Sequence, residues 1–242
     1  MTDSRPWYDT AFEGGYLDLY PHRDHAAARA EIAALLARGV RGRVLDLGCG
    51  FGRHLVALRE RGLEAFGLDR SLALLSRARE LSGRIVRGDF RALPFHGASF
   101  DAVLMLFSSF GYFDDPTNAL VAREVARVLA PGSLAVFDLM NPARVRATLV
   151  PESRARRGAL EIRERRRLEP TRVVKEVWVR ESGAPERRWR EDVRLYEPAE
   201  FAALLAGAGL RIERVEGDFG GRPLTADSPS QIVWARLASA AQ

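Results

Sequence analysis

The sequence is poor in cysteine, in lysine and in long apolar runs. One cysteine among 242 residues excludes an internal disulfide framework and a metal site built from clustered cysteines. No apolar stretch is long enough to cross a bilayer, and residues 1–7 lack the apolar core of a signal peptide. We therefore expect a cytoplasmic globular protein without a metal centre.

Positive charge comes almost entirely from arginine. Hydrophobic residues make up 47% of the chain and charged residues 29%, which is ordinary for a globular protein. The formal net charge is +5 and the pI is about 9.9, a balance that suits an anionic partner such as nucleic acid. A composition rich in arginine and alanine also arises from a high-GC genome, so both explanations of the charge stay open.

The most informative stretch is an apolar run that ends in an acid and is followed by three glycines. Asp46 precedes Gly48, Gly50 and Gly52, and a helical pattern begins after residue 54. This order predicts a buried strand, a tight turn and the N-terminus of a helix. Glycines let a ligand approach main-chain N–H groups, and a carboxylate before the turn suits a ligand with a cationic amino group. A turn that only packs helix on strand is the alternative.

Apolar strands and amphipathic helices alternate from residue 43 to about residue 141 and again after residue 196. The expected strands are residues 43–47, 64–68, 84–87, 102–106, 134–137, 210–215 and 232–237. Strands separated by helices predict a parallel sheet covered on both faces, here an α/β, Rossmann-like sheet of seven strands. No helix separates the last two strands, so we expect them to pair antiparallel.

Two segments lie outside this pattern. Three stretches at 159–168, 172–181 and 187–196 alternate in the manner of antiparallel strands and predict a small β insert after strand five. An aromatic-rich segment and an alanine-rich helix at 24–38 come first. We therefore expect an N-terminal helical cap at 1–40, a Rossmann-like domain at 41–142 and 196–242, and an insert at 143–195. The unpaired edges of the insert favour a homodimer.

Acids follow the second and third strands, at the edge where parallel sheets bind ligands. Asp69 and Arg70 come about 20 residues after the glycine turn, where an acid can accept hydrogen bonds from ribose hydroxyls. A helix cap is the alternative for Asp69. Asp89 and Phe90 follow the third strand, where a simple loop-forming role is the alternative. Strand four leads into residues 107–113, whose aromatics and hydroxyls suit an apolar pocket with a few polar groups.

The glycine turn after Asp46, then Asp69, then Asp89 with Phe90 follow one another along the chain. In this order they resemble the motifs of class I S-adenosylmethionine-dependent methyltransferases, and the resemblance covers residues 43–141, the last helix and the last two strands. The resemblance implies S-adenosylmethionine as cofactor and a Rossmann-like domain that binds it. It implies Asp89 at the adenine amino group, Phe90 beside the ring and Phe107 against the cofactor. The aromatic N-terminus and the insert further resemble the small-molecule branch, which includes glycine-type and amino-sugar N-methyltransferases.

The resemblance implies methyl transfer to an N or O atom of a small molecule. An amine acceptor needs only to be neutral, whereas a hydroxyl needs a general base. The candidate bases are His22, His25, His54, His96 and Tyr112, and the resemblance places Tyr112 near the substrate. The aromatic segment either packs in the core or closes over the cofactor as a lid, with Tyr16 as its expected contact and His22 brought near the site.

Three other functions stay open. An RNA methyltransferase is favoured by the basic charge, but strand four lacks the Asn/Asp-Pro-Pro-aromatic motif of base-amino methylation. A non-catalytic cofactor-binding module would keep the scaffold without turnover. A nicotinamide dehydrogenase is disfavoured because the glycine spacing is one residue short of Gly-x-Gly-x-x-Gly. The arginines at 163–167 either face solvent or recognise a substrate carboxylate or phosphate.

Overall fold

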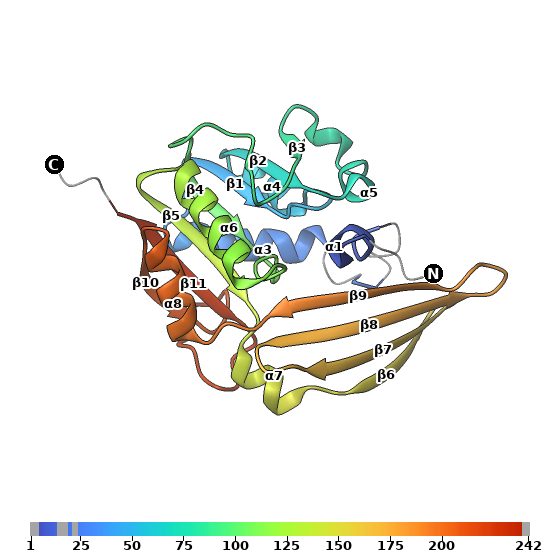
Figure 1. Ribbon diagram of the computed structural model, residues 1–242. Helices are drawn as coiled ribbons and strands as arrows, with labels where there is room; N and C mark the ends of the chain where they lie inside the picture. Colours follow the sequence, from blue (N-terminus) through green and yellow to red (C-terminus); the bar gives the residue numbers. More distant parts are fainter. Residues whose placement is uncertain (1–4, 14–18, 21–23, 239–242) are drawn as a thin grey trace.

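The computed structural model describes residues 5–13, 19–20 and 24–238, which form a larger and a smaller β-sheet (Figure 1). The larger sheet has 7 strands in the order β10-β11-β5-β4-β1-β2-β3, and the smaller has 4 in the order β6-β7-β8-β9. The predicted α/β fold with an added antiparallel sheet is confirmed. No helix in the described part of the chain is long and apolar enough to span a membrane.

The first five strands of the larger sheet run parallel, as predicted. They are β1 (Arg43–Leu47), β2 (Glu64–Asp69), β3 (Ile85–Arg87), β4 (Phe100–Met105) and β5 (Leu129–Leu139). β11 (Gln231–Leu237) pairs antiparallel with β5, and β10 (Leu210–Glu216) pairs antiparallel with β11. The carboxyl ends of β1, β2 and β4 therefore lie at one edge, where a ligand can meet all three.

β5 begins earlier than the sequence predicts. Phe100 pairs with Leu129 and Ala102 with Leu134, so the register shifts between these two pairs. Gly132 takes a φ of +76° inside this stretch, a conformation that suits glycine. Residues 130–132, which precede the strand predicted at 134–137, therefore form an irregularity within β5.

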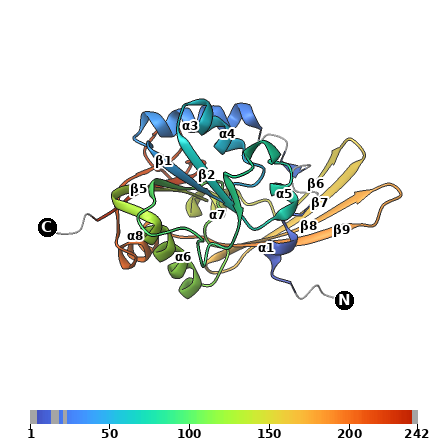
Figure 2. The same cartoon turned by 90° about the horizontal axis from the view of Figure 1, so that it is seen from above.

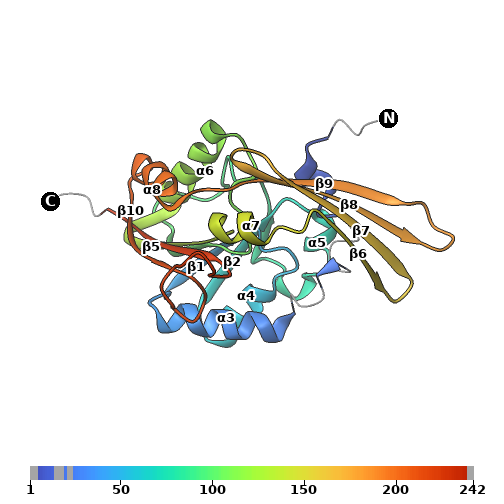
Figure 3. The same ribbon diagram turned by 90° about the horizontal axis from the view of Figure 1, so that it is seen from below.

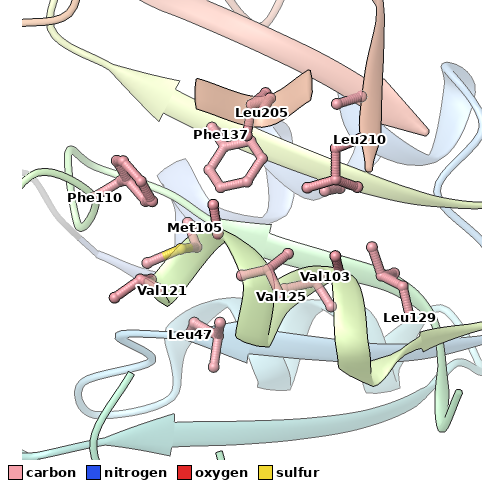
Figure 4. Packing of buried hydrophobic residues seen from close by; sticks show 14 of the residues in the cluster. Leu47, Val103, Met105, Phe110, Val121, Val125, Leu129, Phe137, Leu205 and Leu210 are labelled. Carbon is pink, nitrogen blue, oxygen red and sulfur yellow. The ribbon is translucent and has the colours of Figure 1, made fainter. Parts of the chain in front are cut away.

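Helices cover both faces of the larger sheet (Figures 1 and 2). α3 (His25–Ala37) and α4 (Arg53–Glu60) pack on one face, and α6 (Asp115–Val128) and α8 (Pro198–Gly207) on the other. Figure 4 shows the hydrophobic core on the face covered by α6 and α8, where Val121 and Val125 of α6 and Leu205 of α8 face Met105 and Phe137. Each fully buried side chain of this size stabilises the fold by roughly 1.5–3 kcal/mol.

Shorter helices precede the first strand or lie between later ones. They are α1 (Trp7–Thr10), α5 (Leu72–Leu75), the 3₁₀ turn η1 (Arg79–Leu81) and α7 (Pro142–Thr148). The longer helices begin at acidic caps: Asp24 accepts from the N–H of Ala27 at 2.8 Å, and Asp114 from that of Thr117 at 2.9 Å. These caps fix the start of α3 and α6.

The smaller sheet has one strand more than the sequence predicts (Figure 3). Its strands are β6 (Glu152–Arg157), β7 (Leu160–Leu168), β8 (Arg172–Glu181) and β9 (Arg187–Arg194), all antiparallel. β6 has no apolar alternation because it is an edge strand with mostly exposed residues, so no hydrophobic pattern indicates it.

The two parts of the N-terminal 40 residues pack on different sheets. α3 lies against α4, and its Ala28, Ile32 and Leu35 belong to a core of the larger sheet. Trp7 and Phe12 instead pack on the smaller sheet, beside buried side chains of β7, β8 and β9. The domain boundaries predicted from the sequence therefore remain a proposal. The contacts of α3 associate this helix with the larger sheet.

Candidate active site

A cavity lies at the carboxyl ends of β1, β2 and β4. It brings together nine residues predicted from the sequence: Asp46, Gly48, Gly50, Asp69, Arg70, Asp89, Phe90, Phe107 and Tyr112. Gly52 lies behind this wall as the N-cap of α4, where a Cβ would be 2.2 Å from Leu81 Cδ1. Tyr16 and His22 lie outside the described residues.

The glycine turn lines the cavity, and little room is left for a side chain at Gly48. Gly48 has a φ of +83°, and a Cβ there would lie 3.1 Å from the Cβ of Ser109 and 3.5 Å from the ring of Phe90. The N–H groups of Gly48 and Cys49 donate to the carbonyl of Leu68, at 2.8 and 3.2 Å, which ties the turn to β2. The turn is therefore rigid, and a ligand can approach it closely.

Asp46 lines the cavity with a buried carboxylate. Asp46 is 1% exposed, and its Oδ2 accepts no hydrogen bond from any described residue. His54 Nδ1 is 3.7 Å from Oδ2, which is too far for a hydrogen bond. A buried carboxylate oxygen without a donor is costly, so this atom fits a ligand that brings a cationic N–H group.

A buried charge cluster lies behind Asp46, and sequence reasoning missed its centre, Glu31. Glu31 Oε2 is 2.9 Å from both His54 Nε2 and Arg53 Nη1. Burial alone would lower the pKa of His54, but Asp46 and Glu31 outweigh burial and raise it. Phe107 covers the cluster, with its ring centroid 5.8 Å from that of His54 and 4.2 Å from Arg53 Cζ. Glu31 lies on α3, with no local sequence signal to connect it with the glycine turn.

Asp69 joins the glycine turn to the end of β2. Its Oδ2 accepts from the N–H of Gly50 and its Oδ1 from that of Ser71, both at 2.8 Å. Burial raises the pKa of Asp69 despite these two donors. Each oxygen can accept one further hydrogen bond, so the local cap and a ligand hydroxyl are compatible.

The carboxylate of Asp89 is already fully engaged. Arg91 donates from its backbone N–H and Nε to Oδ1, both at 2.9 Å, and from Nη2 to Oδ2 at 2.7 Å. Arg70 Nη1 donates to Oδ2 at 2.6 Å. Arg91 is the main reason that the pKa of Asp89 is lowered. Four donors fill the four acceptor positions of a carboxylate, so an adenine amino group would have to displace one of them.

The N-terminal segment lies over the cavity. Arg70 Nη2 binds Asp9 Oδ2 of α1 at 3.0 Å, and Ser71 Oγ donates to the carbonyl of Phe12 at 2.7 Å. Tyr8 and Phe12 line the cavity as a result. The aromatic segment therefore covers the cavity and also packs on the smaller sheet. It thus combines the two alternatives, packing and covering, that the sequence left open.

The loop after β4 holds an unusual backbone conformation beside the cavity. Phe107 and Ser108 both have a φ of +56°, the left-handed region that costs about 1–2 kcal/mol for each non-glycine residue. Asp138 of β5 holds them: its Oδ2 accepts from Phe107 N at 3.0 Å, and its carbonyl accepts from Ser108 N at 2.9 Å. Strain of this kind is concentrated at functional sites.

The smaller sheet supports the other end of this loop. Arg194 donates its backbone N–H to the carbonyl of Gly111 at 2.8 Å, and Arg172 Nη1 donates to the carbonyl of Phe113 at 2.9 Å. Between them, the ring of Tyr112 stacks on that of Phe12, with centroids 5.8 Å apart. The insert therefore positions one wall of the cavity.

The remaining candidate bases are less well placed. His25 and His96 are exposed, although the ring of His25 contacts Phe51 of the cavity wall, with centroids 5.7 Å apart.

Burial, together with Asp46 and Asp69, raises the pKa of the Cys49 thiol, which disfavours a thiolate nucleophile.

The arginine run of β7 is paired with acids. Arg163 and Arg165 both bind Glu152, at 3.0 and 3.3 Å, and Arg166 binds Glu164. The positive charge of this strand is therefore largely neutralised locally.

Comparison with known proteins identifies the class. Residues 44–132 match a family described as a methyltransferase domain. The dTDP-3-amino-3,4,6-trideoxy-alpha-D-glucopyranose N,N-dimethyltransferase of Streptomyces venezuelae is 30% identical over 226 residues, which cover 86% of this chain and 92% of that protein. The cypemycin N-terminal methyltransferase of a Streptomyces species is 29% identical over 202 residues, 78% of this chain and 81% of that one. The structure of the sugar N-methyltransferase KedS8 from Streptoalloteichus sp ATCC 53650 shares the fold, with a TM-score of 0.71, 24% identity and 92% of each chain covered.

The chain therefore belongs to the methyltransferase family. It is a class I S-adenosylmethionine-dependent enzyme of the small-molecule branch, as the resemblance in the sequence predicts. Its cofactor is S-adenosylmethionine, and its reaction is methyl transfer to an N or O atom of a small molecule. The dehydrogenase and the non-catalytic module are thereby set aside.

Proposed function

We propose that the enzyme methylates an amine of a small molecule, and that the acceptor lies among the aromatic side chains Tyr8, Phe12, Tyr112 and Phe113. One observation carries the choice of nitrogen over oxygen. His54 is the one histidine among the described lining residues, and its two ring nitrogens both face carboxylates. It is thus poorly placed to act as the general base that a hydroxyl acceptor needs.

The cofactor residues predicted from the sequence are part of this proposal. Asp46 would hold the amino group of S-adenosylmethionine, because its buried Oδ2 needs a cationic donor. Asp69 would accept from the ribose hydroxyls, and Phe90 and Phe107 would lie against the cofactor. The bound cofactor supplies a methyl group activated by its sulfonium. The protein contributes orientation and the exclusion of water, and the N-terminal segment over the cavity serves the second.

An aromatic acceptor site suits an amine for a second reason. The nitrogen becomes positively charged when it takes the methyl group, and aromatic faces attract cations by about 0.5–2 kcal/mol. The names of both relatives also denote methylation of nitrogen. An amino sugar or an amino terminus is thus the acceptor class that we favour. Tyr112 then forms a wall of the site, and neither its hydroxyl nor His22 is needed as a base.

Paired acceptors test this proposal. Methyl transfer from labelled cofactor is measured to an amino sugar and to the same sugar with a hydroxyl in place of the amine. We expect at least about 100-fold faster transfer to the amine, because the hydroxyl lacks a base worth 10²–10⁴-fold. Tyr112→Phe should keep the amine activity, and Tyr112→Ala should reduce it. Equal transfer to both acceptors, with Tyr112→Phe inactive on the hydroxyl, would assign Tyr112 as a base and refute the proposal.

We also infer a homodimer through the smaller sheet, because β6 is an edge strand with mostly exposed residues. Light scattering of the intact chain should give twice the chain mass, and a monomer at micromolar concentration would contradict it. Nucleic acid remains the less favoured partner, since the arginines of β7 are paired with acids. Salt-dependent binding to generic RNA would reverse that preference.

A further inference from the structure

We propose that His54 is a positioning residue that stands in for the cofactor's amino group: it carries a proton beside Asp46 in the free enzyme and releases it when the cofactor binds. This inference rests on the proposed function, which places the amino group of the cofactor at Asp46.

Four charged or titratable side chains lie together and are largely buried. His54 is 6% exposed, Arg53 6%, Glu31 16% and Asp46 2% at their side chains. They come from β1, α3 and α4, and Phe107 covers the cluster from the loop after β4. Asp69 of β2 and the Cys49 thiol are the further titratable groups near Asp46.

The charges within the four balance only in one protonation state of His54. Asp46 and Glu31 carry two negative charges, and Arg53 carries one positive charge. A protonated His54 makes the sum zero, whereas a neutral His54 leaves one uncompensated negative charge. Burial of net charge is costly, so the free protein favours the imidazolium. The raised pKa of His54 agrees with this balance.

An arriving ammonium group changes the balance. It would bind Asp46 Oδ2, the atom that His54 Nδ1 faces at 3.7 Å. Two cations would then share one buried carboxylate, and their repulsion is strong where water is excluded. Loss of the His54 proton to solvent removes this repulsion. Glu31 Oε2 still accepts from Arg53, so that carboxylate keeps a partner.

The consequence is a pH-dependent cofactor affinity. The pKa of His54 is raised in the free enzyme and falls when the ammonium group is bound. Between those two pKa values, binding releases a proton, so the association constant rises with pH by up to about tenfold per pH unit. Above that interval the dependence disappears, until the amino group of the cofactor itself loses its proton.

Calorimetry of S-adenosylhomocysteine binding tests the proposal. Titrations near pH 6.5 in buffers of different ionisation enthalpy give the number of protons released. We expect a substantial fraction of one proton from the wild type, close to none from His54→Gln, and the wild-type value from His96→Gln, whose side chain is exposed. The affinity of His54→Gln should also vary less with pH. Binding without proton release, or release that persists in His54→Gln, overturns the proposal.

A second measurement does not depend on a variant that folds. The chain has 4 histidines, so the ring resonances of His54 can be followed by NMR in the wild type and assigned through their proximity to the ring of Phe107. The pKa of His54 should be lower with S-adenosylhomocysteine bound than without it. An unchanged pKa refutes the role of His54 and leaves the cofactor site intact. Absence of any binding at every pH would instead refute the proposed cofactor site.

Discussion

The two halves of the cavity are formed by different kinds of chemical groups. The half at the glycine turn consists of main chain and buried carboxylates, with Asp46 and Asp69 at the ends of neighbouring parallel strands. The opposite half consists of aromatic rings, from a segment before the first strand and a loop after the fourth. The first half offers charge and hydrogen-bond acceptors at fixed places, whereas the second offers shape and a weakly cation-attracting surface.

The halves also differ in what holds them in place. The glycine turn is fixed by hydrogen bonds within one sheet, from Gly48, Cys49 and Gly50 to residues of β2. The aromatic half depends on tethers to other units: Arg70 to Asp9, and Arg172 and Arg194 to the loop after β4. The half at the glycine turn, where we propose that the cofactor binds, should therefore be insensitive to changes in the insert. The aromatic half, where we propose that the acceptor binds, should respond to loss of single tethers.

The largest expected effect comes from Asp46. Asp46→Ala should weaken S-adenosylhomocysteine binding by about 100-fold or more, because the ammonium group loses a buried charged partner worth roughly 3 kcal/mol. Calorimetry measures this affinity. Asp46→Asn, of equal size, separates loss of charge from loss of shape and should also bind weakly. Wild-type affinity in both variants would contradict the assignment of Asp46.

A smaller effect is expected at Asp69. Asp69→Ala should weaken cofactor binding by about 10–100-fold and reduce the free energy of unfolding by about 1–3 kcal/mol, since the N–H groups of Gly50 and Ser71 lose their acceptor. Binding and thermal unfolding are measured together. In Asp69→Asn, one oxygen remains as acceptor, so stability should recover more than affinity does. Full cofactor affinity in Asp69→Ala would show that Asp69 only caps the helix and does not bind the cofactor.

Loss of the tether at Arg70 should separate the two halves. Arg70→Gln breaks the contacts to Asp9 and Asp89, which are partly exposed and worth about 1 kcal/mol or less each. We expect the acceptor KM to rise about 3–10-fold, a free-energy change of that size, and cofactor affinity to change less. Arg84→Gln, which breaks an exposed pair with Glu64, is the matched control. Equal losses for cofactor and acceptor would show that the halves are not independent.

The smallest effect is expected in the insert. Arg166→Glu replaces an ion pair with Glu164 by a like-charge contact and should lower stability by about 1 kcal/mol or less. Cofactor affinity should remain at the wild-type value. Arg167→Glu, beside Glu169, serves as the control for added negative charge. If a folded Arg166→Glu protein no longer binds cofactor, the insert belongs to the cofactor site.

Sequence reasoning located the residues at the glycine turn and the strand ends because their signals are local. Asp46 and its glycines occupy seven consecutive positions, and Asp69 and Asp89 follow apolar strands at expected distances. The order of strands was predictable for the same reason, since each element carries its own periodicity. β6 escaped because an exposed edge strand has no buried face to leave a pattern.

The partners of these residues were not predictable. Glu31 meets His54 across 23 positions, and Arg70 meets Asp9 across 61. The engagement of Asp89 by two arginines also changes its expected role, because an acid at the right place in the chain need not have a free acceptor.

The sequence by itself determined the parallel sheet, the glycine turn and the acids at the strand ends, because short-range periodicity and backbone stereochemistry encode them. Only the tertiary structure decided that Asp46 keeps an oxygen to which no described residue donates, that His54 lies between two carboxylates, and that the N-terminal rings Tyr8 and Phe12 line the cavity. These features depend on which distant side chains share a buried space. That choice is made by the packing of whole elements and leaves no periodic trace in the chain.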